Sequence, residues 1–287
     1  MRVPSKTEES LPGMNRAARV AAVVALATLV GLAGGCNKLK ARDQLNKGVQ
    51  QYKAAHYEQA IDHFKNAVEL DPRLLNARLY LATAYANQYV PGVDNPDNNR
   101  NAELAIEQFQ EVLKLQPGNL NSLKGIAALY FQMKKFDQSK EYQRQVIQND
   151  PNDPEAYYSI AVIDWTQAYV PRMEERAKQG LKPDEPLKDK KVCAAIREKN
   201  QDKVKEGMEM LEKAIQLRPD YEDAMAYLNL MYRERADYEC EDEAARAADF
   251  KTADEWVQKT MDTKKAKAAK QTGPGGIVLE QQQQPQQ

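Results

Sequence analysis

The chain has 287 residues, a formal net charge of −1 and 29% charged residues, so it has no excess positive charge with which to bind nucleic acid or an anionic membrane surface. Its 13 glycines leave little room for the glycine-rich loops that bind phosphates. Ala, Leu, Lys, Glu and Gln are abundant and β-branched clusters are scarce after residue 40, a composition that favours helices.

An apolar segment lies near the start of the chain. Arg16 and Arg19 precede an uncharged run over residues 20–32, and small residues then lead to Cys36. A charged start, an apolar stretch of 13 residues and small residues before a cleavage point are typical of a secretory signal. The run is shorter than the roughly 20 residues of a membrane-spanning helix. The sequence therefore predicts a signal peptide over residues 1–35.

The cysteine that ends this segment resembles the lipobox of bacterial lipoproteins, in which the cysteine is acylated and becomes the mature N-terminus. Leu32 lies four residues before Cys36, whereas the family prefers leucine three residues before. The resemblance implies a lipid on Cys36, and Asn37 favours the outer over the inner membrane, so we expect a lipid-anchored envelope protein that faces the periplasm. An uncleaved anchor and an ordinary signal with an incidental cysteine are the alternatives, and the start at Met1 or Met14 stays open.

Four prolines end similar short patterns: "VELDP" at Pro72, "LKLQP" at Pro117, "IQNDP" at Pro151 and "IQLRP" at Pro219. They are separated by 45, 34 and 68 residues, which equal 34 plus 11, 34, and twice 34. A 34-residue period with a closing proline resembles the tetratricopeptide repeat, a pair of antiparallel helices. The resemblance implies an all-α solenoid of about five helix-turn-helix repeats, at residues 41–72, 75–117, 120–151, 154–219 and 222–262.

The first and last repeats differ in how well they match this pattern. In the first, Gly48 stands at a position that the family keeps small, and the second helix carries Ala60, Phe64 and Ala67 on one face, at i, i+4 and i+7. The fifth repeat has no closing proline, as is common for a terminal repeat. Its second helix is expected at about 241–262, with four residues for burial: Ala244, Ala248, Val257 and Met261.

Long insertions are expected between the two helices of repeats 2 and 4, around residues 90–101 and at about 168–201. Each insertion begins near a Tyr-Val-Pro sequence. Pro91 and Pro171 are expected to end the first helices of these repeats, because proline interrupts helical hydrogen bonding. The charged insertion of repeat 4 is either a solvated loop or a partner-binding arm.

Short segments flank the predicted repeats. Residues 36–40 are expected to be a tether between the lipid and the solenoid. From residue 263 the sequence reads "TKKAKAAKQTGPGGIVLEQQQQPQQ", which is rich in Gly and Gln. Such a segment cannot bury enough apolar surface to offset the entropy of ordering, so residues 263–287 are predicted to be a disordered tail.

The sequence carries no pattern typical of a catalytic or metal site. His56 and His63 lie seven residues apart, without a cysteine or carboxylate cluster spaced for a metal ion. No G-x-S-x-G motif and no phosphate-binding loop occur. We therefore expect a protein that is not an enzyme and that needs neither a metal nor a cofactor.

Two cysteines remain once Cys36 is assigned to the lipid, and an even number suits an oxidising compartment. The repeat resemblance places Cys193 and Cys240 in the inter-helix segments of neighbouring repeats, which line one edge of a stacked solenoid. It implies a Cys193–Cys240 disulfide that holds the insertion of repeat 4 to repeat 5. Two free thiols are the alternative.

The resemblance also implies a partner-binding groove, because the first helices of such repeats line the concave face. Apolar and aromatic residues at the inward offsets suit a peptide or helix, and packing within the core is the alternative interpretation. Two of these residues occupy sites where the family's carboxylate clamp needs polar side chains, so recognition of chaperone tails is not expected. The inward offsets fall on Leu45, Val49, Tyr52, Leu79, Thr83, Lys124, Ala128, Phe131, Tyr158, Val162, Trp165, Leu230 and Arg233.

These observations predict a non-catalytic, membrane-anchored scaffold that binds an envelope protein or a peptide segment of one, and no nucleic acid. An assembly or secretion factor is the expected role, by analogy with the family. A structural envelope protein and an accessory subunit of an envelope enzyme, such as one that handles polysaccharide, are the alternatives. The sequence does not choose among these roles, and it leaves the oligomeric state open.

Overall fold

The computed structural model describes residues 36–182, 185–187, 189–240 and 242–271. These residues form helices joined by turns, with no strand among them, as the all-α prediction requires. The predicted signal peptide, residues 1–35, lies outside the described residues. A first helix spans residues 36–53, and the others are α2 (Tyr57–Leu70), α3 (Leu75–Gln88), α4 (Pro96–Leu115), α5 (Leu120–Gln132), α6 (Phe136–Asn149), α7 (Pro154–Lys178), α8 (Lys190–Leu217), α9 (Glu222–Tyr238) and α10 (Glu243–Gln271).

The chain divides into two compact units, residues 1–84 and 85–287. In the first unit Gly48 permits close packing of the first helix on α2, because a Cβ atom there would lie 2.5 Å from the ring of Phe64. Ala60, Phe64 and Ala67 are all fully buried, which confirms the predicted apolar face of α2. The ring of Phe64 stacks on that of Tyr80 at 5.5 Å between centroids.

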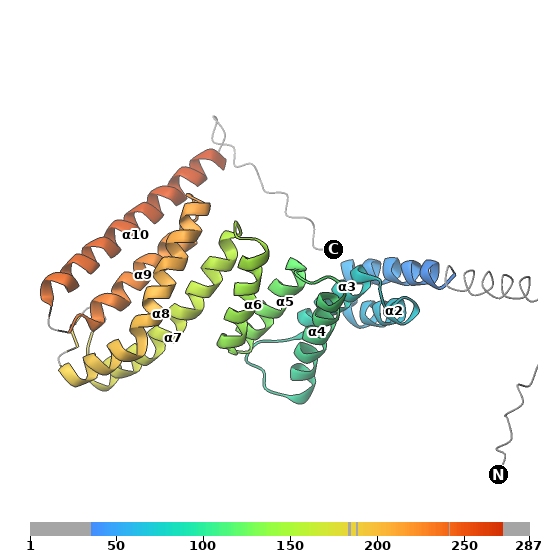
Figure 1. Cartoon of the computed structure of the whole chain (residues 1–287), viewed down its shortest axis with the longest axis horizontal. Helices are drawn as coiled ribbons and strands as arrows, with labels where there is room; N and C mark the ends of the chain where they lie inside the picture. Colours follow the sequence, from blue (N-terminus) through green and yellow to red (C-terminus); the bar gives the residue numbers. More distant parts are fainter. Residues whose placement is uncertain (1–35, 183–184, 188, 241, 272–287) are drawn as a thin grey trace, which may run out of the picture. The chain divides into compact units, whose positions relative to one another are not determined.

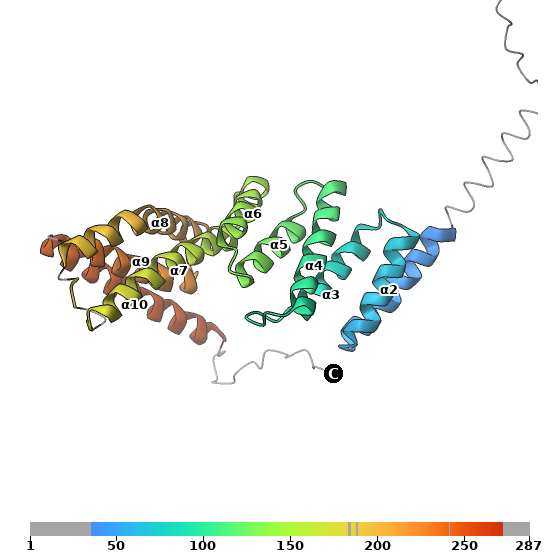
Figure 2. The same cartoon turned by 90° about the horizontal axis from the view of Figure 1, so that it is seen from below.

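In the second unit, helices that follow one another in the chain pack as antiparallel pairs, and successive pairs lie side by side (Figures 1 and 2). α5 packs on α6, α7 on α8, and α9 on α10, while α8 and α7 also contact α9. One core cluster of this unit lies among α7, α8 and α9, where Leu211, Leu228 and Met231 are fully buried. This arrangement is the predicted helical solenoid.

The insertion of repeat 4 differs from the prediction, because most of it lengthens the two helices and only about residues 179–189 lie between them. α7 has 25 residues and continues past Pro171 to Lys178. α8 has 28 residues. Arg172 and Arg176, which follow the proline, are buried in ion pairs with α9. These tertiary contacts, together with the buried Ala168, hold the helix together where the proline alone would end it.

The insertion of repeat 2 forms a compact turn before α4, so here the predicted end of the first helix near Pro91 is close to the observed one, Gln88. The Asn98 side chain organises this turn. Its amide nitrogen donates to the carbonyls of Val90 at 2.9 Å and Val93 at 2.7 Å, and its oxygen accepts from the Val90 amide at 2.7 Å. The remaining inserted residues lengthen α4, which starts at Pro96.

Both flanking segments are more helical than predicted. Residues 36–40 belong to the first helix and are not an extended tether. At the other end α10 reaches Gln271, so residues 263–271 are helical, and the predicted tail over 272–287 lies outside the described residues. Lys267 anchors this last part of α10 through ion pairs with Glu222 and with Asp220.

The buried face of α10 was also predicted wrongly. Ala244 and Ala248 are exposed, and Met261 keeps 59% of its surface exposed. The reason is an ion pair: Asp249 is buried against Arg235 of α9 and turns a different face of α10 toward its neighbour. The buried positions are Asp249, Ala253 and Thr260.

Candidate functional site

A hollow of about 400 Å³ opens between α5, α6, α7 and α9 in the second unit. No Asp, Glu, Lys or Arg lines it, although 29% of the whole sequence is charged. It brings together four residues that the sequence predicts for a groove: Ala128, Phe131, Tyr158 and Val162. The other lining residues are Ala127, Gln132, Ser139, Gln143, Ser159, Ile163 and Tyr227.

Helix caps fix the two walls of this hollow. The Asn119 side chain accepts a hydrogen bond from the Ser122 amide and starts α5, and Asp153 caps α7 by accepting from the Glu155 amide. Phe131 lies at the end of α5, packs on the ring of Phe136 at 5.9 Å and keeps 38% of its surface exposed. A partly exposed aromatic side chain at the rim of an uncharged hollow can serve as an anchor for a bound segment.

Aromatic rings continue from the hollow along α7. Tyr158 contacts the rings of Tyr221 at 5.1 Å and Tyr227 at 5.5 Å, and Trp165 contacts Tyr227 edge-on at 5.3 Å. Burial raises the pKa of Tyr158 and of Tyr227, so both hydroxyl groups stay neutral. Trp165 is half-buried and packs against the core cluster, and its Nε1 atom is buried without a hydrogen-bond partner among the described residues.

The other predicted groove residues are not among the residues that line this hollow. Lys124 forms an ion pair with Asp153, and Arg233 pairs with Asp254 at 2.7 Å. Neither lines the hollow, and nor does Leu230, which is half-buried on α9. Four further predicted residues are half-buried within the first unit: Leu45, Val49, Tyr52 and Leu79.

Some residues of the hollow were not predicted. Ser139 and Gln143 form its floor from α6, where Ser139 donates from Oγ to the Ala127 carbonyl at 2.8 Å. Tyr227 comes from α9, at a separation of 69 residues from Tyr158 along the chain (227 minus 158). The inward offsets of the repeat pattern fall on first helices only, whereas Ser139 and Gln143 lie on a second helix, α6. The repeat periodicity therefore gave no signal for the floor.

Each of the two histidines forms a hydrogen bond with a glutamine side chain. Nδ1 of His56 lies 2.9 Å from Oε1 of Gln51, and Nδ1 of His63 lies 2.7 Å from Oε1 of Gln44. Across the described residues no group of His, Cys, Asp and Glu is arranged to hold a metal ion. None of the helices in the described part of the chain combines the length and the apolar character needed to cross a bilayer.

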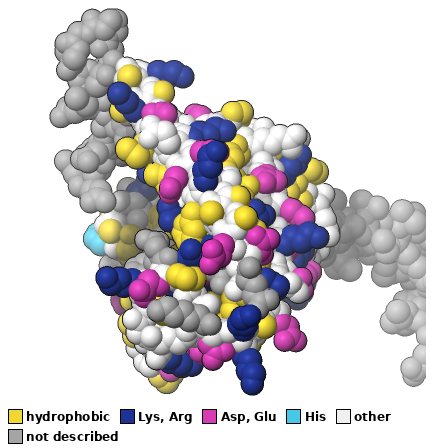
Figure 3. Space-filling model, turned by 90° about the vertical axis from the view of Figure 1, so that its left-hand side faces the viewer, with side chains coloured by type: hydrophobic (Ala, Val, Ile, Leu, Met, Phe, Trp, Pro, Cys, Tyr) yellow, Lys and Arg dark blue, Asp and Glu magenta, His cyan; other side chains and the backbone are white. Residues whose placement is uncertain are grey.

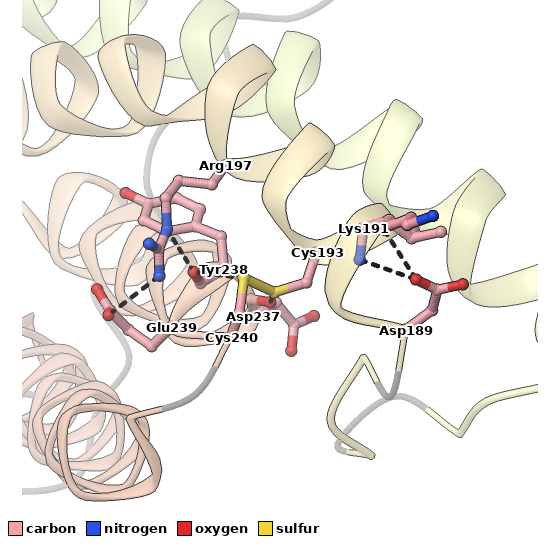
Figure 4. The surroundings of a disulfide bond; sticks show 9 residues. Asp189, Lys191, Cys193, Arg197, Asp237, Tyr238, Glu239 and Cys240 are labelled. Carbon is pink, nitrogen blue, oxygen red and sulfur yellow. Dashed lines mark hydrogen bonds and ion pairs between the residues drawn. A yellow bond between two sulfur atoms is a disulfide. The ribbon is translucent and has the colours of Figure 1, made fainter.

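The two predicted cysteines form a disulfide at one edge of the second unit (Figure 4). Cys193 lies in the first turn of α8 and Cys240 in the turn after α9, with their Cα atoms 5.7 Å apart. Arg197 reinforces the same junction by donating from Nε to the Tyr238 carbonyl at 2.8 Å. Cys36 is exposed and is not part of a disulfide.

Next to the disulfide, buried charges join α7 to α9. Arg172 pairs through Nε with Glu234 at 2.8 Å and through Nη1 with Asp237 at 2.5 Å. Arg176 pairs with Asp237 at 2.8 Å and also donates to the Lys182 carbonyl. Burial raises the pKa of Glu234 to about 7. These ion pairs fix the part of α7 that follows Pro171, where the sequence predicted the helix to end.

A second buried network joins α6, α7 and α8. Lys140 pairs with Asp164 at 2.5 Å and with Glu206 at 2.6 Å, and Arg144 also pairs with Glu206. Burial raises the pKa of Asp164 to about 6, against the opposing effect of the Lys140 ammonium group. Two of its members are next in sequence to lining residues: Asp164 follows Ile163 in α7, and Lys140 follows Ser139 in α6. The network therefore joins two of the helices that line the hollow.

The raised pKa of Asp164 predicts a specific dependence of stability on pH. Between pH 4 and about 6 the folded state holds this proton and the unfolded state does not, so stability falls as pH rises and then levels off. From pH 4.5 to 7.5 the expected loss is on the order of 2 kcal/mol. Urea unfolding of the wild type and of Asp164→Asn at both pH values measures it. The account is contradicted if the two proteins change in parallel.

On the face that Figure 3 shows, the described side chains form no patch of one charge. Lys and Arg side chains alternate there with Asp and Glu, and hydrophobic side chains are scattered among them. Such a mixed surface is typical of solvated helices. The uncharged hollow therefore differs from this surface in composition.

Comparison with known proteins supports the fold. Residues 99–163 match a family model described as tetratricopeptide repeat. The crystal structure of a MamA protein is 13% identical, with 80% of this chain and 94% of that chain covered and a TM-score of 0.54. MamA from Desulfovibrio magneticus RS-1, residue 41 to its end, is 18% identical, with 79% and 96% covered and a TM-score of 0.53. No curated protein matches the sequence. The fold is thus an all-α solenoid of the tetratricopeptide type.

Proposed function

We propose that the protein is a non-catalytic scaffold, anchored by a lipid on Cys36 in the bacterial cell envelope, that binds a segment of another envelope protein in the hollow. The observation that carries this proposal is the uncharged, aromatic lining between α5, α6, α7 and α9. Aromatic anchors in a groove between helices suit the apolar side chains of an extended or helical segment.

The chemistry of the hollow favours a polypeptide over a charged ligand. Its polar groups are amides and hydroxyls, from Gln132, Gln143, Ser159 and the two tyrosines, which suit backbone carbonyl and amide groups. The half-exposed Phe131 offers an apolar contact at the rim. An anionic or cationic ligand would be desolvated there without a countercharge, which is costly.

The lipid anchor rests on the sequence before Cys36 and on the position of this residue. Cys36 is exposed and free of the disulfide, so its thiol is available for acylation. Residues 36–40 are helical, so they span about 7 Å at the helical rise of 1.5 Å per residue. We infer that the first repeat follows the lipid almost directly and lies close to the membrane surface.

Binding at the hollow is tested by isolating tagged protein from cells with its bound proteins. We expect Phe131→Asp to reduce the amount of the main co-isolated protein at least about tenfold. The reason is that burying the introduced charge costs more than about 1.4 kcal/mol. Leu115→Asp is the matched control, because Leu115 has 41% of its surface exposed, close to the 38% of Phe131, and lies outside the hollow. Equal loss or equal retention in both variants refutes binding at the hollow.

Anchoring is tested separately by fractionation and by labelling cells with an alkyne analogue of palmitate. Wild-type protein is expected in the membrane fraction with incorporated label. Cys36→Ser should lose the label, because the thiol that accepts the lipid is gone. Label that persists in this variant contradicts the assignment of the anchor.

A further inference from the structure

The end of α10 lies close to the hollow. Lys267, in the last turns of α10, forms ion pairs with Glu222 and Asp220 at the start of α9. The neighbouring Tyr221 places its ring 5.1 Å from that of Tyr158, which lines the hollow. The end of α10 thus lies beside the start of α9 (Figure 1). The ring contact of Tyr221 with Tyr158 joins this region to the hollow.

The sequence that follows α10 matches the hollow in charge. Residues 272–287, which lie outside the described residues, read "TGPGGIVLEQQQQPQQ" and include one charged residue, Glu280. Their only run of large apolar side chains is Ile277, Val278 and Leu279. A segment without charge up to Leu279 can enter an uncharged hollow without desolvating an ion.

The chain length from α10 permits this contact. Ile277 is six residues beyond Gln271, which corresponds to at most about 20 Å of extended chain. Gln271 itself is about 6 Å beyond Lys267 along the helix, at 1.5 Å per residue. The intervening "TGPGG" contains three glycines, which accept the backbone conformations of a reversing turn.

We infer that Ile277, Val278 and Leu279 bind in the hollow of their own chain and compete with the external partner. This inference rests on the proposed function, since it assigns an internal competitor to the same site. The amide and hydroxyl groups that line the hollow, such as those of Gln143 and Ser159, suit the backbone groups of this segment. An external partner has to displace the segment in order to bind.

The size of the competition follows from the tether. A short flexible linker gives an effective concentration on the order of 1 mM. If the free segment binds the open hollow with a dissociation constant of about 100 µM, the tethered segment raises the apparent constant for any competitor about tenfold. A weak contact is therefore enough to regulate access.

The test uses the full chain and a fluorescent peptide of residues 272–287, titrated by anisotropy. We expect the peptide to bind I277E/V278E/L279E about tenfold more tightly than the wild type, because that variant no longer fills its own hollow. Q282E/Q283E/Q284E is the matched control; it adds the same charge outside the apolar run and should behave as the wild type. All of these changes lie beyond α10, so they leave the helices intact.

Other outcomes overturn the inference. It fails if the peptide binds no protein, if it binds all three equally, or if adding Phe131→Asp to I277E/V278E/L279E leaves binding unchanged. Competition that increases with protein concentration would assign the segment to the hollow of a second copy, and also refutes binding within one chain. If the peptide does not bind but Phe131→Asp still reduces the co-isolated protein, the proposed function stands without an internal competitor. If the peptide binds as expected but Phe131→Asp leaves the co-isolated protein unchanged, the internal contact stands and the external partner at the hollow is refuted.

Discussion

Replacing Asp237 with alanine is expected to lower the free energy of unfolding by about 3–5 kcal/mol. The change leaves two arginines without their shared carboxylate, and Arg176 is only 1% exposed. A buried charge that loses its partner keeps the full cost of desolvation. Urea denaturation at pH 7.5, followed by circular dichroism, measures the difference.

An exposed pair provides the control for this effect. Asp254 pairs with Arg233 at 2.7 Å, but its side chain is 72% exposed. Asp254→Ala should therefore cost less than about 1 kcal/mol. If the two alanine variants lose the same stability, the buried ion pairs do not hold α7 to α9 as described.

The second large effect is expected from the disulfide. Cys193 and Cys240 are 47 residues apart, so the bond restricts a long loop in the unfolded chain. Replacing both with serine should lower the free energy of unfolding by about 2–4 kcal/mol. The double replacement avoids leaving one free thiol, and denaturation under non-reducing conditions measures the loss.

Cys36→Ser is the control for the double variant, because Cys36 is exposed and unpaired. It should leave stability within about 0.5 kcal/mol of the wild type. Reductant should lower the stability of the wild type to that of the double variant and leave the double variant unchanged. A wild type that is insensitive to reductant contradicts a stabilising role for this bond.

The repeat period predicted the elements whose packing is local. Gly48 and Phe64 belong to one helical hairpin, so their small and large side chains meet as the pattern of the first repeat implies. Phe131 and Tyr158 lie on first helices of successive repeats, and the family offsets place both at the hollow. Neighbouring repeats pack on each other, so a periodic pattern carries this information.

Contacts between residues that are far apart in the chain were not predicted from the sequence. Asp237 meets Arg176 at a separation of 61 residues and Arg172 at 65, and no periodicity links these positions. From the local sequence alone, Pro171 indicates a helix end. The ion pairs with Asp237 stabilise the helix beyond the proline, so α7 continues to Lys178. The buried face of α10 was also missed, because the ion pair with Arg235 buries Asp249 and leaves its neighbour Ala248, which was expected to be buried, exposed.

The disulfide shows an intermediate case. The number of cysteines and their places in neighbouring repeats identified the pair, but not the element that holds it. Cys193 lies in the first turn of α8, although an insertion outside the helices was expected. The prediction that both cysteines lie at the same edge of the repeats was correct, because the order of the helices determines that edge. The start of α8 was not predicted, because the lengths of α7 and α8 depend on buried ion pairs.

The most direct measurement for the central claim, that the hollow between α5, α6, α7 and α9 binds a protein segment, is photo-crosslinking in intact cells. A photoreactive amino acid replaces Phe131 in one strain and Leu115 in another, and mass spectrometry identifies the adducts. The account predicts one dominant envelope protein, crosslinked through one segment, from Phe131 and not from Leu115. The same adducts from both positions, or adducts to lipid and cell wall only, would contradict it.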